Sequence, residues 1–154
     1  MSAKKPAPGP AVFIARPQTV RMTFVGETWA VRDGLRQLFD MMPLCNLSPD
    51  GRGTAQIVLA EALNNIVEHA YANHDGQIEV ALHVSPPDLV CEITDSGLAM
   101  PEGALPAGTL TPLEQVQNLP EGGFGWYLIR TLARDLHYRR DGGRNLLSFR
   151  LDAR

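Results

Sequence analysis

The sequence predicts an α+β domain in which about three helices cover one face of a mixed, mostly antiparallel sheet. Alternating apolar residues indicate short strands, apolar residues spaced by three and four indicate helices, and the segments follow the order β-α-α-β-β-loop-α-β-β. The chain has 154 residues, 44% of them hydrophobic and 20% charged, which is enough to bury a core. We therefore expect a two-layer sandwich, with residues 1–10 as a disordered tail and residues 11–154 as a single domain.

The first half of the chain predicts one strand and two helices. Residues 20–24 alternate as a strand does, and a helix follows over about residues 28–42, where a proline ends it. Ser48 suits an N-cap and Pro49 suits the first position of a second helix, which extends to about Tyr71.

The second half predicts two hairpins, separated by a long loop and a helix. Strands over residues 78–84 and 89–94 flank a Ser-Pro-Pro-Asp turn, and a glycine- and proline-rich stretch over 95–123 follows. Such a long loop in a compact domain is usually a functional lid or disordered. A third helix is expected over about residues 126–136, and the last hairpin turns at residues 141–143.

The composition excludes several kinds of phosphate chemistry. Of 14 basic residues, only Lys4 and Lys5 are lysines, and both lie in the tail. A Walker A loop, a protein-kinase fold and a Schiff-base enzyme each need a lysine in the folded domain. A net charge of −3 without a basic tract argues against a nucleic-acid partner, and no apolar run suits a membrane helix or a signal peptide. We expect a cytoplasmic protein whose two cysteines, Cys45 and Cys91, are reduced.

A polar stripe interrupts the second predicted helix, which is otherwise largely apolar. Glu61, Asn65 and His69 are spaced by four residues and lie on one ridge, with Asn64 and Glu68 beside them. A carboxylate beside a buried helix face needs water or a partner, and Glu and Asn oxygens suit Mg²⁺. The stripe is therefore either a wet cleft that binds an ion or the solvent face of an amphipathic helix. A single histidine near a helix end is more often a packing or capping residue than a metal ligand.

Two glycine clusters are candidate binding loops. Asp95 and Gly97 follow a predicted strand, and they form either an ordinary turn or an acceptor for an exocyclic amine beside a glycine that lets a flat ring approach. Gly122, Gly123 and Gly125 precede the third helix. Backbone N–H groups at a helix start form a ready anion site, and a plain flexible loop is the alternative.

In this order and spacing, the segments resemble the Bergerat-fold (GHKL, histidine-kinase-like) ATPases, which include histidine-kinase catalytic domains, gyrase B and MutL. The resemblance is closest to the anti-sigma-factor serine/threonine kinases of bacteria, and it covers about residues 20–151. Four segments carry it: the N box EALNNIVEHAY (61–71), the first glycine box DSGLA (95–99), the second glycine box GGFGWYLI (122–129) and the closing strand NLLSF (145–149).

The resemblance implies ATP and Mg²⁺ as cofactors and a role for each matching residue. Asn65 would coordinate Mg²⁺, Glu61 would be the general base on the acceptor hydroxyl, and Asp95 would accept the adenine amine. Arginines such as Arg130 or Arg134 would help to neutralise phosphate charge. The other nucleotide-binding residues that it implies are Gly97, Ala99, Gly122, Gly123, Gly125 and Ser148.

The function implied is that of an ATP-binding anti-sigma regulatory factor that phosphorylates a small STAS-type anti-sigma antagonist. A sigma factor would be a further partner, a homodimer would be compatible with the family, and no nucleic acid or membrane would be contacted. The alternative is a non-catalytic, ATP-binding module that sequesters a sigma factor or another regulator through an exposed corner at residues 41–44 and the tail. A histidine-kinase catalytic fragment is a third interpretation, which the His-Ala-Tyr ending of the N box disfavours.

Overall fold

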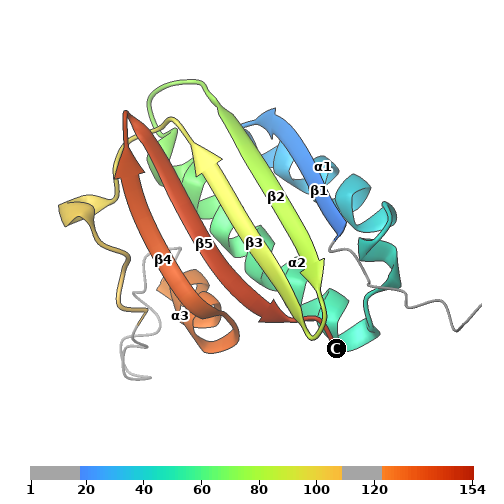
Figure 1. The fold of residues 1–154 in the computed structure, drawn as a ribbon. Helices are drawn as coiled ribbons and strands as arrows, with labels where there is room; N and C mark the ends of the chain where they lie inside the picture. Colours follow the sequence, from blue (N-terminus) through green and yellow to red (C-terminus); the bar gives the residue numbers. More distant parts are fainter. Residues whose placement is uncertain (1–17, 109–122) are drawn as a thin grey trace, which may run out of the picture.

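The computed structural model describes residues 18–108 and 123–154, which form two layers (Figure 1). One layer is a sheet of five strands: β1 (Gln18–Val25), β2 (Gln77–Ser85), β3 (Asp88–Asp95), β4 (Arg134–Asp141) and β5 (Arg144–Asp152). The other layer contains the helices α1 (Thr28–Asp40), α2 (Pro49–Asn65) and α3 (Gly123–Leu132), all on one face of the sheet. The predicted tail and the boundary at residue 11 lie outside the described residues.

The strands follow the order β1-β2-β3-β5-β4. Every pairing among them is antiparallel, so the predicted α+β sandwich is confirmed, and no parallel pair occurs between the described strands. The register of β3 with β5 places Asp88 beside Asp152 at one end of the sheet and Asp95 beside Asn145 at the other. The second of these ends faces the site described below.

The core lies between the sheet and α2. Strand β5 alternates, with Leu147, Phe149 and Leu151 buried and the residues between them more exposed. Helix α2 contacts both α1 and α3, and its Leu59 and Leu63 are fully buried. This enclosure agrees with the nearly all-round apolar sequence of the helix.

The start of α2 follows the predicted capping pattern, whereas the corner before it differs from prediction. The Ser48 hydroxyl accepts a 3.0 Å hydrogen bond from the Gly51 N–H, and a proline holds the first helical position. In the preceding corner, Met41 and Met42 are 43% and 61% exposed, but Leu44 is fully buried. The prediction of an exposed corner over residues 41–44 is therefore wrong for Leu44.

The third helix ends earlier than predicted. Residues 134–136 belong to β4, because Arg134 pairs with Arg150 of β5. Asp135 has a φ of 53°, outside the helical region, and the register shifts between Arg134 and His137. The spacing of Leu132 and Leu136 suits a helix equally well, so periodicity could not reveal where strand pairing takes over.

The last hairpin turns where predicted. Gly142 and Gly143 both have positive φ, 56° and 79°, as a two-residue hairpin turn requires. Within residues 18–108 and 123–154, no helix combines the length and the hydropathy needed to cross a bilayer.

Candidate functional site

A pocket lies between the end of α2, the loop after β3 and the start of α3. Its cavity volume is about 40 Å³, and the empty space reaches about 460 Å³ when the open mouth is included. Most of its wall is apolar, with contributions from Ile66, Trp126 and Leu147. A mainly apolar hollow with a few convergent polar groups is typical of small-molecule sites. The polar side chains that line it are Asn65, His69, Asp95, Tyr138 and Asn145.

The helix that carries the polar stripe changes pitch beside this pocket. Residues Ile66–Ala70 continue α2 as a π turn, a feature frequent at functional sites. Asn65 is only 5% exposed, so the solvent-face alternative is wrong for this residue. Asn64 lines a separate groove between α1 and α2. His69 is exposed at the pocket wall. The sequence predicted a packing or capping residue, but His69 neither packs in the core nor caps the helix.

The side-chain amide of Asn65 has an unused hydrogen-bond donor. Its Nδ2 atom is buried and has no hydrogen-bond partner among the described residues. Leaving such a group unpaired costs on the order of 1–3 kcal/mol, which a bound ligand would offset. The nitrogen suits a phosphate oxygen, and the same amide turned by 180° offers an oxygen to Mg²⁺. In the part of the chain that the structure describes, no cluster of three or more His, Cys, Asp or Glu residues suits a metal ion.

The start of α3 lies directly over Glu61 and Asn65. A Cβ atom added to Gly125 would lie 2.6 Å from Oε2 of Glu61 and 3.5 Å from Nδ2 of Asn65. The structure therefore brings these three predicted residues together, and only a residue without a side chain keeps the space between them open. Gly123 is the first residue of α3, and Gly122 lies outside the described residues.

Asp95 faces the same pocket from the end of β3. Its side chain is 4% exposed, and its Oδ1 accepts hydrogen bonds of 2.9 Å from the N–H of Gly97 and from Nδ2 of Asn145. No described residue donates a hydrogen bond to Oδ2, so this oxygen is available to a ligand. Burial raises the pKa of Asp95, whereas the donors Asn145 and Gly97 and the charge of Arg140 act in the opposite direction.

The first glycine box packs against the end of the π turn. The N–H of Leu98 donates a 2.9 Å hydrogen bond to the carbonyl of Ala70, and a Cβ atom on Gly97 would lie 2.7 Å from the carbonyl carbon of Ala70. Ala99 is exposed and lines the pocket. The loop thus forms one wall of the pocket, with the helix end as its support.

Ser148 is not brought to this pocket. Leu147 lines the pocket and is buried, and successive residues of a strand point to opposite faces of a sheet. Ser148 therefore lies on the face away from the helices, where its register partners are Glu92 and His137.

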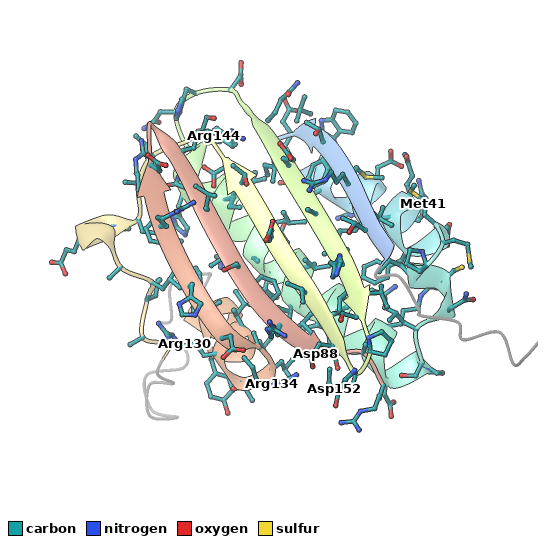
Figure 2. All side chains as sticks on the ribbon, in the orientation of Figure 1. Met41, Asp88, Arg130, Arg134, Arg144 and Asp152 are labelled. Carbon is teal, nitrogen blue, oxygen red and sulfur yellow. The ribbon has the colours of Figure 1, made fainter. Side chains whose placement is uncertain are left out.

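The two arginines considered for phosphate binding make other contacts. Arg134 forms an ion pair of 2.5 Å with Asp88, at the end of β3 opposite Asp95, and Figure 2 shows Arg134 near Asp88 and Asp152 there. The two aspartates are seven steps apart along the strand, or about 23 Å, so the expectation for Arg134 is wrong. Arg130 is exposed and donates a 2.7 Å hydrogen bond to the carbonyl of Pro106.

Sequence patterns missed three residues that surround Asp95. They are Asn145, Tyr138 and Arg140. Asn145 is buried and donates a hydrogen bond to Asp95, and its Oδ1 accepts hydrogen bonds from Tyr138 and from Arg140. One signal was present in the sequence. Asn145 has the same alternation phase as the buried Leu147 and is therefore a polar residue on the core face of a strand, a position that needs partners.

An antiparallel sheet covered on one face by helices, with a helix asparagine and a strand-end aspartate lining one pocket, defines a class of nucleotide-binding ATPase domain. The chain belongs to the histidine kinase-like ATPase domain family, whose sequence profile matches residues 30–151.

Relatives within this family are named as serine kinases. The chain is similar to proteins named serine-protein kinase RsbW from Bacillus mycoides (strain KBAB4), Bacillus cereus (strain AH187) and Bacillus thuringiensis subsp. konkukian (strain 97-27), with 33% identity over 94 residues in each case. The predicted resemblance to anti-sigma-factor serine kinases is thereby confirmed. The match covers 60% of this chain and spans only 59% of the length of each relative.

Proposed function

We propose that this protein is an ATP-binding anti-sigma regulatory factor that phosphorylates a small STAS-type anti-sigma antagonist on serine or threonine. The family and the printed names of the relatives support this proposal. The observation that carries it is the unpartnered, buried amide of Asn65, which lies with Glu61 beneath the glycine-rich start of α3.

Asp95 and the first glycine box would hold the adenine base. The Oδ2 atom of Asp95 would be the acceptor, because Asp95 lines the pocket and Oδ1 already receives two hydrogen bonds. The close packing of Gly97 on Ala70 holds the loop after β3 against the end of the π turn. Ala99 would contact the nucleotide from the same loop.

Asn65 and the start of α3 would bind the phosphates together with Mg²⁺. The cation neutralises phosphate charge when bound, and Asn65 would supply one of its oxygen ligands. The N–H groups at the start of α3 are not satisfied within the helix and favour an anion. They belong to Gly123 and Gly125, and the proposal assigns Gly122 to the same run from its sequence position.

Glu61 would accept the proton of the attacking hydroxyl group. Its carboxylate is partly exposed, and it makes no hydrogen bond to any described residue, so both oxygens can accept. A carboxylate within hydrogen-bond reach of the hydroxyl contributes typically 10²–10⁴-fold to such a reaction. Because sigma factors act in the cytoplasm, the proposal places this protein there, with a sigma factor as its second partner.

A phosphate-transfer assay tests this proposal. The full chain is incubated with Mg²⁺-ATP and a STAS-domain protein from the same organism, and ATP affinity is measured separately by calorimetry. Wild type should transfer phosphate. Glu61→Gln should keep ATP affinity within about threefold and lose about 100-fold or more of the transfer rate. Asn65→Ala should lose ATP affinity by about tenfold or more.

Asn64→Ala is the matched control, because Asn64 is the neighbouring asparagine and lines a different groove. It should retain both binding and transfer. Absence of transfer by wild type, or undiminished transfer by Glu61→Gln, would refute the kinase activity. Absence of ATP binding by wild type would refute the whole proposal.

A second candidate function is sequestration of a regulator without catalysis. The exposed Met41 and Met42 favour it, because adjacent exposed methionines provide an adaptable apolar contact surface. Capture of a sigma factor that survives Glu61→Gln and is lost in Met42→Glu would support this function, and capture that depends on Glu61 would contradict it.

A further inference from the structure

The β4–β5 hairpin controls the orientation of Asp95 through Asn145. The two residues are partners in the β3–β5 register, and both are buried. The Nδ2 atom of Asn145 donates a hydrogen bond of 2.9 Å to Oδ1 of Asp95 and another of 2.8 Å to the carbonyl of Leu98. One side chain thus joins the carboxylate to the loop that follows it.

Tyr138 and Arg140 determine which way the Asn145 amide points. The Tyr138 hydroxyl and Nη1 of Arg140 donate hydrogen bonds of 2.6 Å and 2.9 Å to Oδ1 of Asn145. A guanidinium group can only donate, and Asp95 and the Leu98 carbonyl can accept, so the amide oxygen has to face Arg140 and the amide nitrogen has to face Asp95.

The same two residues also hold the loop. Nη1 of Arg140 donates a 2.8 Å hydrogen bond to the carbonyl of Gly97, and the Tyr138 hydroxyl accepts a 3.0 Å hydrogen bond from the N–H of Met100. The Asn145 amide therefore cannot turn over without breaking several hydrogen bonds at once.

This arrangement leaves Oδ2 of Asp95 as a hydrogen-bond acceptor for a ligand. Oδ1 receives donors from Asn145 and Gly97, which fixes the carboxylate plane. Burial raises the pKa of Asp95, and the two donors and the charge of Arg140 act in the opposite direction. In its ionised form the carboxylate accepts hydrogen bonds and does not donate them. A purine with an amino group at position 6 can donate to this oxygen. A purine with a carbonyl group there presents a second acceptor, and the two oxygens repel each other.

Resting on the nucleotide site proposed above, we propose that Asn145, held by Tyr138 and Arg140, is a positioning residue that makes the site selective for 6-aminopurine over 6-oxopurine nucleotides. The selectivity comes from the fixed amide, since an unsupported carboxyl group at the same place could rotate or carry a proton that a 6-oxo group accepts.

Calorimetry with ATP and inosine triphosphate tests this proposal on the full chain. The two nucleotides differ in the hydrogen-bonding pattern of the base edge at positions 1 and 6. Wild type should bind ATP about tenfold or more tightly than inosine triphosphate. Asn145→Leu keeps the branched shape of the side chain and removes its hydrogen-bonding groups. It should weaken ATP binding about tenfold and reduce the preference to about threefold or less. Tyr138→Phe should reduce the preference in the same direction by a smaller factor.

Tyr71→Phe is the control for loss of a hydroxyl group beside the same loop. The Tyr71 hydroxyl accepts from the N–H of Ser96 and donates to the carbonyl of Gln77, without contacting the Asn145 amide. Its removal should lower Tm and leave the ratio of ATP to inosine triphosphate affinity unchanged. An equal fall in this ratio for Tyr71→Phe and Tyr138→Phe would mean general loosening of the loop and would overturn the inference.

The remaining outcomes separate the inference from the proposed function. Equal wild-type affinity for both nucleotides, or an unchanged ratio in Asn145→Leu and Tyr138→Phe, would overturn the inference while ATP binding stands. If Asn145→Leu does not fold, the ratio in Tyr138→Phe decides alone. Failure of wild type to bind either nucleotide would overturn the proposed function, and this inference with it.

Discussion

Gly97 packs against the carbonyl group of Ala70 so closely that a Cβ atom added to Gly97 would lie 2.7 Å from the carbonyl carbon. The adjacent N–H of Leu98 donates a hydrogen bond to the same carbonyl. This contact joins the helix that carries Asn65 to the loop that follows Asp95, and so it sets the spacing between the two walls of the pocket.

Gly97→Ala should therefore damage both the fold and the site. The added methyl group meets backbone, which cannot move aside as a flexible side chain does, so we expect a loss of about 1–3 kcal/mol in the free energy of unfolding. Thermal unfolding should show Tm lower by several degrees, and calorimetry should show weaker ATP binding.

Gly53→Ala is the matched control for this substitution. Gly53 lies within α2, and nothing lies within 4 Å of a Cβ atom built there. Alanine in place of a helical glycine should add up to about 1 kcal/mol of stability. An unchanged Tm and ATP affinity in Gly97→Ala would contradict the close packing described above.

Gly125→Ala should separate binding from stability. The new methyl group would lie 2.6 Å from Oε2 of Glu61, which is the end of a flexible side chain and can move. Alanine also favours the helix by up to about 1 kcal/mol. We expect Tm to change little while ATP affinity falls about tenfold or more. A fall in Tm with retained affinity would show that Gly125 serves only packing.

Asp95→Asn should stabilise the protein at neutral pH and remove ATP binding. Burial raises the pKa of Asp95 in the folded state, so the folded protein binds this proton more tightly than the unfolded chain does. The stability that wild type gains from the proton is present in acid and is lost as the pH rises through the raised pKa. Asparagine keeps an oxygen for the two donors without the charge.

Thermal unfolding across a range of pH measures this effect. Asp95→Asn should have a higher Tm than wild type at pH 7, and the difference should narrow as the pH falls through the raised pKa of Asp95. A lower Tm for the variant at pH 7 would show that the ionised carboxylate stabilises the fold.

Asp88→Asn should lower Tm at pH 7, and this difference from wild type should shrink in acid, which is the opposite of the pH dependence expected for Asp95→Asn. Hydrogen bonds from Arg134 and Arg150 hold the pKa of Asp88 below its usual value. Its ionised form thus contributes stability at pH 7, and this contribution is lost as the pH falls through the lowered pKa.

Arg134 and Arg150 are exposed and Asp88 is partly exposed, so solvent weakens these ion pairs and the effect on Tm should be small. Asp88 lies at the end of β3 away from the pocket, and ATP affinity should stay within about twofold of wild type. A larger loss of affinity would mean that this end of the sheet communicates with the site.

Much of the fold was predictable because local signals agree with the final packing. Alternation predicted the strands, and the Ser48-Pro49 pair predicted the start of α2. The boundary between α3 and β4 was wrong because Leu132 and Leu136 suit a helix as well as they suit the observed structure. The pairing of Arg134 with Arg150 of β5 makes this segment a strand and ends the helix before it.

The candidate site was likewise predictable in part. The sequence by itself determined which residues match the motifs of the family, among them Glu61, Asn65, Asp95 and the glycines. Each of these motifs lies within a single helix or a single loop, so its spacing can be read along the chain. Only the tertiary structure decided that Arg134 lies at the far end of the sheet and that Asn145 lies against Asp95. The last contact joins residues 50 positions apart. Such pairings depend on strand register, which no local pattern encodes.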